Sequence, residues 1–261
     1  MRLAAGLEYD GSAYAGWQAQ DHARAVQTEV EAALSRVADQ PVKTTCAGRT
    51  DAGVHALGQV IHFDTGAQRA VDAWLFGANS HLPPDISLRW VREVPQEFHA
   101  RYSARSRRYR YVIHNSRSRS GLFARRASWC THPLDVERMH EAAQHLLGEH
   151  DFSAYRAAEC QSRTPMRRIL EMFVARRGEW VVIEIEANAF LHHMVRNIAG
   201  VLIAIGRRQQ PVDWTRTVLE GRDRRLGGVT VDPDGLYFLR ARYDAAFGLP
   251  EPELNGLSLL P

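Results

Sequence analysis

Residues 43–63, KTTCAGRTDAGVHALGQVIHF, set the pattern from which the fold is predicted. The stretches 43–47 and 57–63 predict two strands, joined by a loop that holds Gly48 and Gly53. Working outward, the hydrophobic pattern predicts four more elements: a strand at 2–9, a helix at 26–38, a short helix at 70–80 and a strand at 86–94. The resulting order, β-α-β-β-α-β, is that of a ferredoxin-like domain.

The second half of the chain repeats this order of elements without an evident sequence repeat. Further elements are predicted at 106–114, 135–147, 167–176, 179–187, 190–205, 212–220 and 235–242, with a hairpin turn at Arg177-Gly178. We therefore expect an α+β fold in which two ferredoxin-like halves lie side by side around a central basic cleft. The expected domains are 1–105 and 106–250, followed by an irregular tail at 251–261.

Composition excludes several classes of protein. The 261 residues are 45% hydrophobic and 24% charged, an ordinary globular balance that argues against disorder, collagen or coiled coil for the whole chain. Cys46, Cys130 and Cys160 are odd in number and form no CxxC pair, which favours buried thiols in a reducing compartment. No signal-peptide pattern opens the chain and no apolar run approaches a membrane span, so we expect a cytoplasmic protein without a membrane partner.

Common catalytic motifs are missing from the sequence. GxSxG, GxGxxG, Walker A and HExxH do not occur, and the 12 histidines lack metal-ligand spacing. We expect neither a cofactor nor a metal. Hydrolase triads, dinucleotide oxidoreductases and kinases are disfavoured for the same reason.

The basic residues are concentrated in one segment. Residues 101–131 contain nine arginines and no Asp or Glu, with five aromatic residues among them: Tyr102, Tyr109, Tyr111, Phe123 and Trp129. Guanidinium groups match phosphates and aromatic faces stack on unpaired bases, so this segment, which Arg101 opens, is typical of nucleic-acid binding. The alternative is a solvated face that happens to be basic.

The loop at 47–55, AGRTDAGVH, offers the best candidate for chemistry. Its Asp51 lies between two glycines, with Arg49 two residues earlier; a plain turn residue is the alternative role for Asp51. In the helix expected at 190–205, Arg196 lies off the apolar stripe. It either faces solvent or faces the cleft, where it could pair with a carboxylate.

Five blocks of sequence, in order, resemble bacterial tRNA pseudouridine synthase A. They are YDGSAYAGWQAQ at 9–20, AGRTDAGVHALGQVIHF at 47–63, ARYSARSRRYRYVIHN at 100–115, CQSRTP at 160–165 and NAFLHHMVRNIAG at 188–200. The resemblance covers residues 2–250, and the RTDAGVH block is highly specific. It implies an isomerase that converts uridine to pseudouridine at positions 38, 39 and 40 of the tRNA anticodon arm.

The resemblance also implies roles for single residues. Asp51 matches the catalytic aspartate, which that family uses without metal or organic cofactor, and Tyr109 matches the tyrosine that stacks on the target uracil. Arg196 matches the arginine that pairs with the aspartate, and Arg49 matches an RNA contact beside it. The implied partners are tRNA, not DNA, and a second copy of the chain in a homodimer.

Two alternatives to a synthase are a non-catalytic RNA-binding protein of the same fold and a small-molecule glycosidase. The glycosidase class usually needs two carboxylic acids, and Asp51 has no evident partner acid in the sequence. One departure from the family pattern is VTVDPDG at 229–235, where Asp232 and Asp234 add unexpected negative charge. If that loop borders the cleft, RNA affinity is altered.

Overall fold

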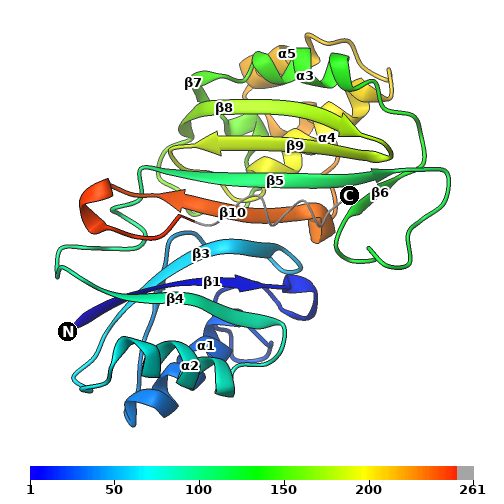
Figure 1. The fold of residues 1–261 in the computed structure, drawn as a ribbon. Coiled ribbons are helices and arrows are strands. Elements are labelled where there is room, and N and C mark those ends of the chain that lie inside the picture. Colours follow the sequence, from blue (N-terminus) through cyan, green and yellow to red (C-terminus); the bar gives the residue numbers. More distant parts are fainter. Residues whose placement is uncertain (252–261) are drawn as a thin grey trace. The chain divides into compact units, whose positions relative to one another are not determined.

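A computed structural model describes residues 1–251. The chain divides into two compact units (Figure 1). The first comprises Met1–Arg107 together with the segment that starts at Tyr237, and the second comprises Arg108–Leu236. The bounds of these units differ from the predicted domains 1–105 and 106–250 in the assignment of the last strand. The predicted tail lies outside the described residues, apart from Glu251.

The first unit has the predicted β-α-β-β-α-β order. Its elements are β1 (Arg2–Tyr9), α1 (Val26–Ala38), β2 (Thr45–Cys46), β3 (His55–Asp64), α2 (Val71–His81) and β4 (Ile86–Val94). Strand β1 pairs antiparallel with both β3 and β4, and β2 pairs antiparallel with β3. Strand β3 therefore lies between β1 and β2, and the helices α1 and α2 pack against each other (Figure 1).

The core of the first unit follows from this pattern. Val26, Val30 and Leu34 of α1 are fully buried, as the helical spacing predicts, and the ring of Trp74 from α2 packs on Phe63 of β3 with 5.3 Å between centroids. Strand β10 (Leu236–Arg242) adds a parallel pair to β3 through Tyr237 and Phe238. The last strand thus pairs with the first two residues of β3, His55 and Ala56, which directly follow the loop that holds Asp51.

The second unit is also a sheet with helices. Its elements are β5 (Ser106–Asn115), β6 (Ser128–Cys130), α3 (Val136–Gln144), β7 (Gly148–Asp151), β8 (Met166–Arg177), β9 (Trp180–Ala187), α4 (Met194–Gly206) and α5 (Trp214–Gly221). The strand order is β5-β9-β8-β7, and β6 runs parallel to β5. The predicted hairpin turn is confirmed between β8 and β9. Together the two units confirm the α+β class.

Several element bounds differ from the prediction. Helix α4 begins at Met194 and not at residue 190, because His193 has a φ of 59°, a left-handed conformation that a right-handed helix cannot include. Helix α3 ends at Gln144, three residues before its predicted end. Strands β6 and β7 are missed because three or four residues are too few to show an alternating pattern.

The cysteines and the helix lengths were also predicted from the sequence. All three cysteines are free and buried, as predicted. Within residues 1–251, no helix combines the length and the apolar character that crossing a membrane requires.

Candidate active-site loop and arginine surface

Asp51 lies in a tight turn between β2 and β3. The backbone N–H of Val54 donates to the backbone carbonyl of Asp51 at 3.1 Å, which closes the turn 51–54. Its third residue, Gly53, has a φ of 79°, as a type II turn requires. Asp51 is therefore a turn residue, as the simpler interpretation had it, and its backbone carbonyl accepts the hydrogen bond that closes the turn.

The segment that follows β1, including Tyr14 and Trp17, is hydrogen-bonded to this loop. Trp17 N–H donates to the carbonyl of Thr50 at 3.0 Å, and Gly53 N–H donates to the carbonyl of Tyr14 at 3.2 Å. A Cβ atom at Gly16 would lie 2.6 Å from the Thr50 carbonyl oxygen, so only glycine allows the two segments to approach this closely. Backbone contacts thus fix the residues on both sides of Asp51.

A buried hydroxyl pair completes the support. The Tyr9 hydroxyl lies 2.8 Å from Thr50 Oγ1, and Gln59 Nε2 donates to the Gly48 carbonyl at 2.7 Å. Burial raises the pKa of Tyr9 above its ordinary value, so the phenol stays protonated. Local sequence pattern assigns no role to the YDGSAYAGW block at 9–17. Its contacts identify it as the support of the Asp51 loop.

Arg49 and Arg101, the two predicted arginine contacts of the first unit, are both exposed. Burial raises the pKa of the Cys46 thiol to about 12, while the positive charges of Arg49 and Arg101 lower it. Because both guanidinium groups act on the same thiol, they belong to one positive region near the end of β2. Both predicted residues therefore lie near Cys46.

Tyr109 and Arg196 belong to the second unit. Tyr109 is a buried residue of β5, and its ring meets that of Phe190 edge to face with 5.0 Å between centroids. Arg196, in the first turn of α4, is half-buried and its Nε donates to the carbonyl of Val231 at 2.8 Å. Both side chains are therefore held in place and do not extend freely into solvent.

The contact at Val231 connects Arg196 to the acidic loop 229–235. The Tyr111 hydroxyl donates to the carbonyl of Asp232 at 2.8 Å, which anchors this loop to β5. Burial raises the pKa of Tyr111; the charges of Asp232 and Asp234 raise it further, whereas the charge of Arg196 lowers it. These three charged groups therefore surround one buried phenol.

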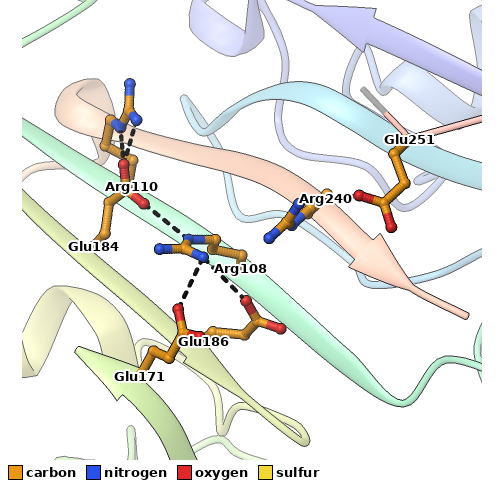
Figure 2. Close-up of polar contacts among 7 residues, drawn as sticks. All are labelled: Arg108, Arg110, Glu171, Glu184, Glu186, Arg240 and Glu251. Atoms are coloured by element: carbon orange, nitrogen blue, oxygen red, sulfur yellow. Dashed lines mark hydrogen bonds and ion pairs between the residues drawn. The ribbon is translucent and has the colours of Figure 1, made fainter. Parts of the chain in front are cut away.

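Two arginines on strand β5, Arg108 and Arg110, have acidic partners (Figure 2). Arg108 Nε donates to Glu184 at 2.8 Å, and its Nη1 contacts Glu171 at 3.0 Å and Glu186 at 3.3 Å. Arg110 also pairs with Glu184. Glu184 and Glu186 are almost fully buried, whereas the side chain of Glu171 is 58% exposed. The sequence analysis did not identify these partners, because they come from β8 and β9.

The other arginines of the segment differ in their surroundings. Arg105 pairs with Asp244, and Arg107 donates to the backbone carbonyls of Ala47 and Ala104. Four more arginines are exposed in the loop between β5 and β6: Arg117, Arg119, Arg125 and Arg126. Leu122 in that loop is 84% exposed and Trp129 beyond it is 49% exposed. The loop, not the strand, presents the basic surface.

Comparison with known proteins places the chain in a family. The family model for tRNA pseudouridine synthase matches residues 5–103 and 142–244. The chain is 56% identical to tRNA pseudouridine synthase A of Coxiella burnetii over 254 residues, 97% of each chain. It is 58% identical to the protein of that name from Methylococcus capsulatus over 249 residues, 95% of this chain and 92% of the relative.

A third relative and one solved structure complete the comparison. The chain is 54% identical to tRNA pseudouridine synthase A of Aeromonas hydrophila over 259 residues, 99% of this chain and 96% of the relative. A chain from the crystal structure of a Cbf5-Nop10-Gar1 complex aligns with a TM-score of 0.32 and 11% identity over 77% of this chain and 45% of that one, too distant to support an argument. The sequence matches show that the chain belongs to the tRNA pseudouridine synthase family and is an isomerase.

Proposed function

We propose that this isomerase converts uridines 38, 39 and 40 of the tRNA anticodon arm to pseudouridine, with Asp51 as the catalytic carboxylate. The observation that supports this most is the construction of the 48–54 loop. Contacts fix the loop on both sides of Asp51: Trp17 and Tyr9 contact Thr50 on one side, and the Tyr14 carbonyl accepts from Gly53 N–H on the other. A reacting carboxylate needs such support, because a small displacement costs much of the rate.

The reaction needs little besides a carboxylate and a pocket for one base. The bond from uracil N1 to ribose C1′ breaks, the uracil rotates, and a bond from C5 to C1′ forms; C5 loses a proton and N1 gains one. Atoms and charge balance without an oxidant. An ionised Asp51 can act as nucleophile or assist cleavage of the glycosidic bond. The target uridine must first leave the base stack, at a cost of a few kcal/mol.

The roles of the other predicted residues are also proposals. We assign stacking on the target uracil to Tyr109, pairing with the aspartate to Arg196, and RNA contacts to Arg49 and Arg101. Tyr109 could in addition accept the C5 proton in the last step. The variant Tyr109→Phe is then expected to bind tRNA normally and to stall before loss of that proton, whereas full activity would remove this role.

The proposed partners follow the same reasoning. The substrate is tRNA, through its anticodon arm, and DNA is not a substrate. We also propose a homodimer in the cytoplasm; free buried cysteines suit a reducing compartment. Sedimentation equilibrium of the purified chain tests the dimer, because a homodimer predicts twice the mass of one chain.

Tritium release tests the assignment of Asp51. Unmodified tRNA transcripts labelled at uracil C5 are incubated with the parent, with Asp51→Asn, and with Asp72→Asn as a matched change at an exposed residue of α2. Release is expected from the parent and from Asp72→Asn only, and mapping of the modified uridines should give positions 38, 39 and 40. If the parent bound tRNA but released no tritium, the alternative of a non-catalytic RNA-binding protein would replace this proposal.

A further inference from the structure

A second site lies in the second unit, beside the exposed arginine loop. A pocket of about 230 Å³ opens between β5, β6 and the acidic loop 229–235. This volume is below the roughly 300–1,000 Å³ of pockets for drug-sized ligands, so it suits a fragment such as one base. Its walls combine carboxylates, aromatic rings and guanidinium groups.

The acidic wall consists of Asp232 and Asp234. Two contacts hold this loop, one at Asp232 and one at Thr230, two residues earlier: Tyr111 donates to the Asp232 carbonyl, and Thr230 Oγ1 donates to Asn197 Oδ1 at 2.6 Å. Because this backbone is anchored, the two carboxylates are presented at fixed places on the wall. Each of them accepts hydrogen bonds and donates none.

A buried histidine also lines the pocket. His114 is only 9% exposed, and its Nδ1 is buried without a hydrogen-bond partner in residues 1–251. Its Nε2 lies 3.5 Å from a carboxylate oxygen of Glu179, an acceptor, so a proton on Nε2 suits that contact. A buried polar atom without a partner is costly, and a ligand that reached Nδ1 would satisfy it.

The other walls suit a nucleotide. The rings of Phe123 and Trp129 line the pocket, and the Trp129 indole is fixed by its Nε1–H, which donates to the Ser116 carbonyl at 2.9 Å. Arg119, exposed, lies on the same lining. Aromatic faces stack on bases, and guanidinium groups pair with phosphates.

We propose that this pocket binds the base of an unpaired guanosine in the RNA substrate, outside the target uridine; this rests on the proposed function in that the ligand is part of an RNA. Guanine presents two adjacent donors, N1–H and N2–H, which match carboxylate oxygens side by side. Uracil presents one N–H between two carbonyl oxygens, which carboxylates repel. The carboxylates of Asp232 and Asp234 therefore favour guanine over uracil, and Arg119 binds the phosphate of the same nucleotide.

Mononucleotide binding tests the pocket without any catalysis. The full chain is titrated with 5′-GMP and with 5′-IMP, which lacks only the N2 amino group, and binding is followed by calorimetry. We expect GMP to bind about tenfold more tightly than IMP, the size of one good base-edge contact. Asp232→Asn and Asp234→Asn should each reduce that preference, and Asp213→Asn, an exposed acid of the same unit, should not.

Two outcomes would overturn the proposal. Equal affinity for GMP and IMP in the parent would remove the guanine contact, whatever the variants do. Failure of an unmodified tRNA transcript to displace bound GMP would show that the pocket takes a free nucleotide and no base of the substrate. The variant Asp51→Asn separates the proposed catalysis from the proposed guanine site. It should abolish tritium release and keep the preference for GMP over IMP, so either proposal can fail while the other holds.

Discussion

Arginines on strand β5 and arginines in the loop after it come from one basic stretch of sequence, but their surroundings differ. Arg108 and Arg110 are tied to Glu184 and Glu186, which β9 supplies. Arg117 and Arg119, in the loop, are exposed. The comparison teaches that a run of like charges in sequence does not measure the positive field at a surface, because distant strands can neutralise part of it.

The physical reason lies in solvation. A guanidinium group removed from water needs a carboxylate and hydrogen bonds to offset its desolvation. An exposed guanidinium keeps its water and can exchange it, with release of counterions, for a phosphate. Arg108 and Arg110 therefore contribute to the structure of the second unit, and we propose that exposed Arg117 and Arg119 contact RNA.

Removing a buried acid is the strongest test of this division. Glu184→Ala leaves two half-buried guanidinium groups without their main partner and is expected to lower the free energy of unfolding by about 3–5 kcal/mol. Urea denaturation measures the loss. Glu171→Ala removes an exposed partner of the same Arg108 and should cost less than about 1 kcal/mol. Equal losses in the two variants would contradict the division into structural and surface charges.

A second test measures how the free energy of unfolding depends on pH, because a buried histidine, His62, titrates differently in the folded and unfolded chain. Burial lowers the pKa of His62 from 6.5 to about 4, with smaller contributions from His99 and Arg2, and its Nδ1 accepts from Ala100 N–H. The neutral ring contributes stability that is complete above pH 6.5 and is lost as pH falls toward 4, because the unfolded chain binds the proton first. The loss amounts to at most about 3 kcal/mol.

The variant His62→Gln should flatten the dependence of unfolding free energy on pH between 6.5 and 4. His22→Gln, at an exposed histidine, should leave the profile as in the parent. A slope in His62→Gln as steep as that of the parent would assign the acid sensitivity to other groups. We expect RNA affinity, which we propose that the exposed arginines provide, to respond to salt instead.

A third test concerns a buried polar group without charge. Tyr9→Phe removes the hydroxyl beside Thr50 Oγ1 and should cost about 1–2 kcal/mol of stability and also lower kcat, since the Asp51 loop loses a support. KM for tRNA should stay unchanged. Tyr243→Phe removes another buried hydroxyl, bonded to the Ala100 carbonyl, and should reduce stability alone. An unchanged kcat in folded Tyr9→Phe would show that the hydroxyl pair does not position the loop.

The smallest effect is expected at the loop arginines. Each of Arg117→Gln and Arg119→Gln should reduce the slope of log affinity for tRNA against log salt concentration by about 0.7–0.9, one phosphate contact each. Arg108→Gln should lower stability without changing that slope. Arg216→Gln, at an exposed arginine of α5, controls for the loss of one charge. A reduced slope in folded Arg108→Gln would place the strand arginines among the RNA contacts.

Much of the fold could be predicted from local pattern. The elements of the first hundred residues, including α1 with its buried Val26, Val30 and Leu34, follow from hydrophobic spacing. The start of α4 could not, because the left-handed conformation of His193 leaves no mark in composition. Strand β10 was expected in the second half and pairs with β3 of the first unit, a pairing between distant segments that local pattern does not encode.

The candidate site was predictable to a similar degree. The RTDAGVH block predicts a role for Asp51, which stays a prediction, and the comparisons confirm the family. The sequence did not identify Tyr9 as the support of that loop, because residues 9 and 50 meet only when β1 pairs with β3. A role for the YDGSAYAGW block becomes visible through these contacts alone.

The sequence by itself determined the α+β class, the family and the residue types available for chemistry, since these depend on local spacing and on blocks of adjacent residues. Only the tertiary structure decided which charges face solvent. Glu184 is 74 residues from Arg110 in sequence, yet the two side chains form an ion pair. The free energy of a charge depends on what surrounds it in space, and those surroundings come from strands that lie far apart along the chain.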